Sequence, residues 1–144
     1  MIAFVIAFAW VGLGPTLLIN LTFCAPNLTF VYPLVWTAGV ALDFYTTYRF
    51  YRQDPGAFEK NELSGYMRRL YRVFGFRAGL VAFLLLVELP IASLIALLLI
   101  PASVRVFSIQ QPSFPQCFVS SLAFHGIIHL GAAGWNALLE RRGP

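Results

Sequence analysis

The stretch 78-AGLVAFLLLVELPIASLIALLLI-100 is apolar over its whole length except for one ionisable residue, Glu88. An α-helix needs about 20 mainly apolar residues to cross the ~30 Å hydrocarbon core of a bilayer. Membrane β-strands instead show alternating patterns of roughly ten residues, and no such pattern recurs in this chain. The stretch therefore predicts a transmembrane helix, and it places the whole chain in the class of α-helical membrane proteins.

Composition supports this class. The chain has 144 residues, of which 59% are hydrophobic and 11% are charged, whereas ordinary soluble domains carry about 25% charged residues. The mean hydropathy is +0.75.

We expect an all-α polytopic protein with a single membrane domain, 1–144, folded as a four-transmembrane-helix bundle. The four expected spans are about 2–23, 28–50, 78–100 and 115–139. The first is interpreted as a retained helix, because it lacks a basic start and a small-residue cleavage site.

The distribution of basic residues predicts an orientation. The connection 51–77 contains most of them, namely Arg52, Lys60, Arg68, Arg69, Arg72 and Arg77. An excess of Lys and Arg marks the cytoplasmic side of a membrane protein. We therefore expect a multi-pass protein of the cell membrane with this loop and both termini in the cytoplasm. The net charge of +4 then reflects topology, and the expected partner is the lipid bilayer rather than nucleic acid.

A short amphipathic helix is expected inside the cytoplasmic loop. Its apolar residues recur at helical spacing, while the arginines fall on other faces of the helix. The apolar residues are Leu63, Tyr66, Met67, Leu70 and Phe74. This pattern is typical of a helix that lies at the membrane interface, with Asn61 or Ser64 as its cap. An alternative makes the segment a cytoplasmic extension of the third span.

Cysteine and tryptophan residues suggest further features. Cys24 and Cys117 both lie near the outer face in this topology, so they could form a disulfide if that compartment is oxidising. The alternative is two unpaired thiols that behave as small apolar residues. Trp10, Trp36 and Trp135 are interpreted as lipid-facing and interfacial anchors.

Ionisable residues within spans are costly, and by default they face the interior of the bundle with a partner. This chain has Asp43 in the second span, Glu88 in the third, and His125 and His129 in the fourth. At 1.5 Å per residue, Asp43 is about 10 Å from the cytoplasmic end of its span, and Glu88 and His129 are each about 15 Å from theirs. Acid and imidazole groups are therefore expected at similar depths.

Helical spacing also predicts which faces meet. In the fourth span, His125, His129 and Asn136 fall on one stripe, because steps of three or four residues keep to one side of a helix. In the second span, Asp43, Thr46 and Thr47 form a similar polar stripe. We expect the two stripes to face each other.

Two histidines four residues apart on a helix can chelate one divalent metal, and a carboxylate from another helix can supply a third ligand. The expected ligands are His125, His129 and Asp43, with zinc as the expected metal. A metal-bound water could then be activated for hydrolysis, with Glu88 or Glu59 as the general base. Buried polar contacts that only hold the helices together, and passage of protons or substrate, are the alternatives.

The stretch 41-ALDFYTTYRFYRQDPGAFEKNELSGYMRRL-70 resembles the signature of a family of small polytopic membrane proteins of unknown function. Members have an Asp and a Thr pair near the end of one span, followed by Glu-x-Asn at the start of the next helix. The matching residues here are Asp43, Thr46, Thr47, Glu59 and Asn61. The family usually has Pro after the Asn, where this chain has Glu62.

The resemblance covers about thirty residues and brings no established activity. It implies that the loop folds back toward Asp43, so that Glu59 and Asn61 would join Asp43 and Asn136 at the inner mouth of the bundle. A structural interpretation makes Asn61 a helix cap and Glu59 an anion in the first turn, near the positive end of the helix.

Three functions are consistent with these patterns. The sequence favours a metal-binding, membrane-embedded hydrolase that acts near the cytoplasmic leaflet. One alternative is a proton- or cation-conducting transporter subunit, which would require a homo-oligomer because four spans are few for a pathway within one protomer. The other is a non-catalytic accessory or scaffold subunit that binds a partner membrane protein.

Overall fold

The computed structural model describes residues 14–22, 29–56, 65–107 and 111–142, and these residues are almost entirely helical with no strand among them. A helical segment, 14–22, comes first. The helices that follow are α2 (Val31–Gln53), α4 (Gly65–Phe74), α5 (Phe76–Phe83), the π-helical turn η2 (Leu84–Glu88), α6 (Leu89–Phe107) and α7 (Phe114–Arg142). The all-α class predicted from the sequence is confirmed for the described residues.

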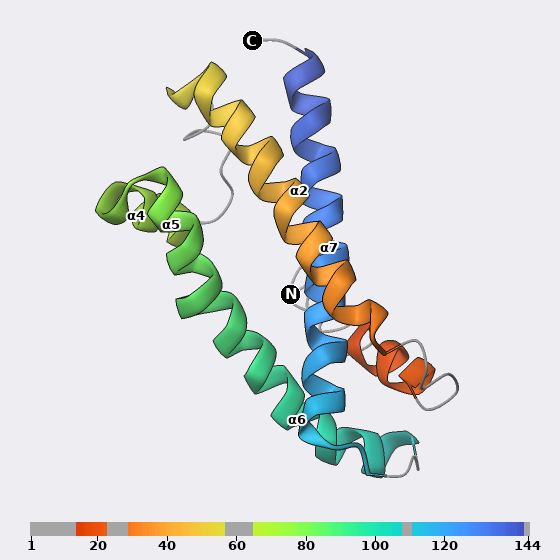
Figure 1. Cartoon of the computed structure of the whole chain (residues 1–144). Coiled ribbons are helices and arrows are strands. Elements are labelled where there is room, and N and C mark those ends of the chain that lie inside the picture. The colour runs from red at the N-terminus through yellow and green to blue at the C-terminus, as the bar shows by residue number, and fades with distance from the viewer. Residues whose placement is uncertain (1–13, 23–28, 57–64, 108–110, 143–144) are drawn as a thin grey trace, which may run out of the picture.

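Helices α2 and α7 lie side by side and run in the same direction (Figure 1). Residue numbers of contacting pairs increase together along the two helices. Gly39 contacts Gly126 near the crossing point, and Arg49 contacts Glu140 near the ends of both helices. The long helix formed by α5, η2 and α6 runs in the opposite direction (Figure 1). This alternation is the order of directions that the predicted second, third and fourth spans require.

Two glycines let α2 and α7 approach each other closely. A Cβ atom built on Gly39 would be 2.2 Å from the backbone oxygen of Gly126, and one built on Gly126 would be 2.5 Å from the Cα of Trp36. Real Cβ atoms do not approach backbone this closely, so any side chain at either position would push the helices apart. Small residues at such crossings are typical of helix contacts in membranes.

Local sequence explains where α2 ends and α7 begins. Asp54 precedes a proline, which disfavours helical backbone, and it adopts an extended conformation with φ −149° and ψ 92°. At the start of α7, the Oε1 of Gln116 accepts hydrogen bonds from the backbone N–H and the hydroxyl of Ser113, at 2.8 and 2.9 Å. These bonds satisfy polar groups that the first turn of a helix leaves free.

Within the described residues, two helical stretches are long and apolar enough to cross a membrane, Phe76–Pro101 and Phe114–Glu140. They coincide with the expected spans 78–100 and 115–139. Helix α2 covers most of the expected span 28–50 but does not meet the same hydropathy criterion, because polar residues line one of its faces. The expected span 2–23 lies largely outside the described residues. The four-helix bundle therefore stays a prediction.

Apolar side chains pack between the helices in two clusters. The first joins the segment 14–22 to α6 and α7 and consists of Ile19, Ile95, Ala96, Leu99 and Cys117. The second consists of Met67, Phe76 and Leu80. Many other large apolar side chains of α6 and α7, such as Leu98 and Ile128, are exposed. Exposed apolar surface of this extent suits contact with lipid.

Cys117 has a free thiol and is fully buried in the first cluster. This arrangement matches the alternative in which the thiol behaves as a small apolar residue. Cys24 lies outside the described residues.

The amphipathic segment of the loop forms a helix of its own, α4. Met67 is buried against Phe76, while Arg68, Arg69 and Arg72 are exposed. A turn at Gly75 separates α4 from α5, so α4 is not a straight extension of the third span. Tyr66 and Phe74 were expected on the apolar face and are exposed. Leu63, Asn61 and Ser64 lie outside the described residues.

Gly75 has φ +75° and ψ 167°, a conformation that is essentially restricted to glycine. We expect Gly75→Ala to destabilise the fold by about 1–3 kcal/mol. Gly134→Ala is the matched control, because a Cβ there meets nothing within 4 Å and its backbone is helical. Thermal unfolding of the two variants in one detergent measures the difference. Equal stability of both variants would contradict the assignment of strain to Gly75.

Candidate functional site

Glu88 lies at the end of a wide helical turn and faces side chains of α2 and α7. The π-helical turn η2 ends at Glu88, two residues before Pro90, which has no backbone N–H and cannot continue the α-helical hydrogen-bond pattern. Such turns occur frequently at functional sites.

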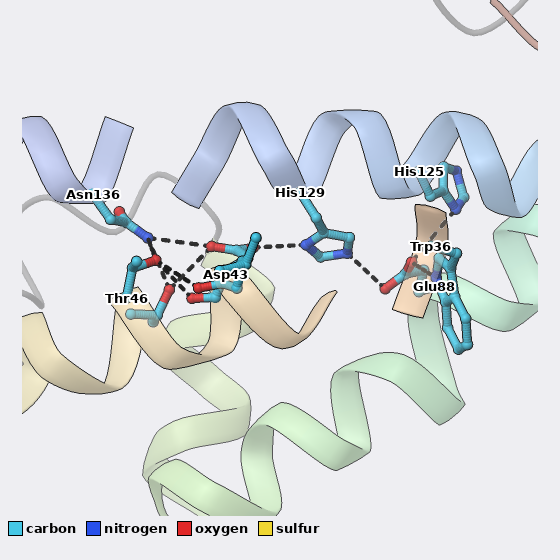
Figure 2. Close-up of polar contacts among 9 residues, drawn as sticks. Trp36, Asp43, Thr46, Glu88, His125, His129 and Asn136 are labelled. Atoms are coloured by element: carbon cyan, nitrogen blue, oxygen red, sulfur yellow. Dashed lines mark hydrogen bonds and ion pairs between the residues drawn. The ribbon is translucent and has the colours of Figure 1, made fainter. Parts of the chain in front are cut away.

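The centre of the site is His129, which lies between two carboxylates from two other helices. Its Nδ1 is 2.6 Å from Oδ2 of Asp43 on α2, and its Nε2 is 3.0 Å from Oε2 of Glu88. Figure 2 shows the imidazole ring pointing from α7 toward both acids. All three side chains are largely buried, with 4% of the Glu88 side chain exposed. The similar distances of Asp43, Glu88 and His129 from the ends of their expected spans predicted this contact.

The second oxygen of Glu88 is bound by Trp36. The indole Nε1 donates a hydrogen bond of 2.7 Å to Oε1 of Glu88. The interpretation of Trp36 as a lipid-facing anchor is therefore wrong, because its N–H binds a buried carboxylate of another helix. A signal was present in the sequence: Trp36 lies seven residues before Asp43, two helical turns along the same face. Trp135 is exposed, as an anchor would be.

On the other side of Asp43, an amide and two hydroxyls continue the polar contacts. The Nδ2 of Asn136 donates to Thr47 Oγ1 at 2.9 Å, to Asp43 Oδ1 at 3.2 Å and to Thr46 Oγ1 at 3.4 Å. Thr47 also donates to Oδ1 of Asp43 at 3.2 Å. The polar stripes of α2 and α7 thus face each other, as their spacing predicted (Figure 2).

His125 is near the site but less tightly bound to it. Its Nδ1 is 3.8 Å from Oε1 of Glu88, beyond hydrogen-bond distance. One turn earlier on α7, the hydroxyl of Ser121 is also buried. Among the described residues, neither atom has a hydrogen-bond partner. Buried polar atoms are nearly always hydrogen-bonded, so these two have hydrogen-bonding capacity that no described side chain uses.

The contacts of His129 determine how many protons the cluster holds. A neutral imidazole has one N–H donor and one acceptor nitrogen, whereas an imidazolium donates from both nitrogens. Two ionised carboxylates offer only acceptors, so a neutral ring could donate to one of them and would repel the other. Both short contacts are hydrogen bonds only if the ring is charged or one acid is protonated. Asp43, His129 and Glu88 therefore share one additional proton.

The arrangement differs from the metal site expected from the sequence. Both ring nitrogens of His129 point at carboxylate oxygens, and His125 does not contact Asp43. In the part of the chain that the structure describes, no three His, Cys, Asp or Glu side chains are grouped so that they could hold a metal ion. The zinc site and the hydrolase built on it stay predictions without support from this geometry.

Two residues singled out in the loop, Glu59 and Asn61, lie outside the described residues. Their predicted approach to Asp43 stays a prediction. Asp43 does have an amide partner from another helix, Asn136 on α7.

Comparison of the chain with protein-family models, with curated proteins and with solved structures finds no match. The resemblance of residues 41–70 to a family signature therefore stays a prediction, and the chemistry of the site is argued from its own side chains.

Proposed function

We propose that this protein is a membrane protein that transfers protons through the chain Glu88–His129–Asp43. The observation that carries the proposal is the imidazole ring held between two carboxylates, which share one additional proton. That proton can be placed on any of the three groups with little movement of heavy atoms. Chains of Asp, Glu and His within membrane spans are typical of proton relays in pumps and transporters.

The dimensions of the polar chain support this role. The site residues of α7 extend from His125 to Asn136, which are eleven residues apart and therefore about 16 Å along the helix axis. This length is about half of the ~30 Å hydrocarbon core of a bilayer. Ser121 and His125 extend the polar groups beyond Glu88 toward the other end of α7. The Glu88–His129–Asp43 relay occupies the middle of this polar stretch and would carry a proton through part of the apolar core.

The proposal includes a membrane topology. Two helical stretches are suited to cross a bilayer, and α2 packs along one of them in parallel. The contacts between α2 and α7 extend from Gly39 and Gly126 to Arg49 and Glu140. A helix that packs along a spanning helix in this way crosses the bilayer with it, so the proposal includes α2 as a span despite its polar face. The loop containing α4 and the C-terminus then lie on the cytoplasmic side. The protein acts as a homo-oligomer, because so few spans cannot enclose a complete pathway.

Glu88→Gln tests the proposal directly. The amide keeps the size of the side chain and can still bind Trp36 or His129, but it cannot exchange a proton. Loss of a proton-transferring group reduces rates on the order of 100-fold in enzymes, and we expect a loss of similar size in proton flux. Purified protein in liposomes, with an imposed potassium diffusion potential and an internal pH-sensitive dye, gives the measurement.

Glu140→Gln is the matched control, since it makes the same chemical change in a carboxylate that pairs with Arg49 and does not belong to the Glu88–His129–Asp43 relay. It should keep the wild-type flux. Proton flux that is unaffected by Glu88→Gln would rule out the relay. Stoichiometric zinc in the purified protein that is lost on replacing His129 would instead support the metal site predicted from the sequence.

A further inference from the structure

Near the end of α2, two arginines from different helices lie over one tyrosine ring. The Cζ atoms of Arg52 and Arg77 are 5.9 and 5.5 Å from the ring centroid of Tyr48. Arg77 also donates a hydrogen bond of 3.1 Å from Nη2 to the hydroxyl of Tyr48. Tyr48 thus gathers two guanidinium groups, one from the last turn of α2 and one from the first turn of α5.

No carboxylate in the part of the chain that the structure describes pairs with either of these two positive charges. Arg49, one turn from Arg52, pairs with Glu140 at 2.6 Å. Among the described residues, no acid is within salt-bridge distance of Arg52 or Arg77. Two like charges held over one ring repel each other, and an anion bound between them relieves that repulsion. The charge distribution therefore selects an anionic ligand.

The base of this pair is fixed by aromatic packing. Phe76 is buried and stacks on Tyr51, with ring centroids 4.3 Å apart, and it also contacts Tyr48 at 5.8 Å. Because Phe76 directly precedes Arg77, this packing sets where the guanidinium of Arg77 emerges. The two arginines start from positions that are already close, so less conformational entropy is lost when a ligand binds.

We propose that Tyr48, Arg52 and Arg77 bind the phosphate group of an anionic phospholipid. Guanidinium groups bind phosphate oxygens in pairs, and arginine suits such recognition better than lysine. Arg77 is the second residue of the apolar stretch Phe76–Pro101, so it stands at the end of a candidate span, the level at which lipid phosphates lie. The site is separate from the Glu88–His129–Asp43 chain and does not depend on proton transfer.

Native mass spectrometry of the full-length protein in detergent tests the site. The protein is titrated with phosphatidylglycerol, with neutral phosphatidylcholine and with inorganic phosphate. We expect preferential binding of phosphatidylglycerol. The affinity for this lipid should fall on the order of fivefold in Arg52→Gln and in Arg77→Gln, and by both factors in the double variant that carries the two substitutions. Tyr48→Phe keeps the ring but removes the hydroxyl that holds Arg77, and it should weaken binding less than the double arginine variant.

Arg49→Gln is the matched control, because it removes the same charge from the same helix at a position already paired with Glu140. It should leave the preference for phosphatidylglycerol nearly unchanged. An equal loss of binding in Arg49→Gln and in the double variant would show that only general surface charge matters and would overturn the site. Inorganic phosphate that binds as tightly as phosphatidylglycerol, with the same dependence on both arginines, would overturn the assignment to a lipid.

Discussion

Replacement of His129 by leucine is expected to destabilise the folded protein by about 3 kcal/mol or more. Leucine fills the space of the imidazole ring with an apolar side chain. It leaves Asp43 and Glu88 buried without the group that lies between them. Removal of one partner from a buried charged pair is far more costly than replacement of the whole pair, because the remaining charge is left uncompensated. Chemical or thermal unfolding in a single detergent, followed by tryptophan fluorescence, measures the change.

His125→Leu is the control for His129→Leu, since it removes the same residue type one turn away on the same helix. The Nδ1 of His125 has no partner among the described residues, so its loss removes an unsatisfied buried group. We expect a change within about 1 kcal/mol. Similar destabilisation by both variants would mean that packing, rather than charge, dominates at His129.

A double variant separates charge from packing at the same position. Adding Glu88→Gln to His129→Leu removes one of the two uncompensated carboxylates, so the double variant should be more stable than His129→Leu alone. Neighbouring residues typically show such coupling, of about 0.5–3 kcal/mol. A double variant that is less stable than the single one would contradict the assignment of the loss in His129→Leu to uncompensated buried charge.

The second large effect is expected for Gly39→Ala, which adds one methyl group at the crossing of α2 and α7. The new Cβ would be 2.2 Å from the backbone oxygen of Gly126, where no flexible side chain can move away. The helices must separate by on the order of 1 Å to restore an ordinary contact. We expect a loss of about 1–3 kcal/mol in stability and a lower proton flux, because the contact between Asp43 and His129 lengthens.

Gly131→Ala provides the opposite expectation. A Cβ on Gly131 meets nothing within 4 Å, and alanine favours helix over glycine by up to about 1 kcal/mol. Unfolding should therefore show Gly131→Ala equal to or more stable than the wild type, while Gly39→Ala is less stable. The close crossing of the two helices would be refuted if both substitutions left stability and flux unchanged.

Much of the site could be predicted because helical periodicity is a local property of the sequence. The spacing of His129 and Asn136 on one helix, and of Asp43, Thr46 and Thr47 on another, placed each set on one face. The cost of burying polar groups in an apolar helix then required those faces to meet. Apolar length likewise predicted the two candidate spans in α5–α6 and α7.

What the sequence by itself determined is therefore the helical class, the candidate spans and the polar faces. Only the tertiary structure decided which groups make contact within them. The approach of Gly39 to Gly126 and the wide turn that ends at Glu88 set the distance and rotation of the helices. They bring His129, and not His125, between the two acids, and they turn Trp36 inward. Hydrogen bonds depend on tenths of an ångström, and such distances are set by packing between segments far apart in the chain.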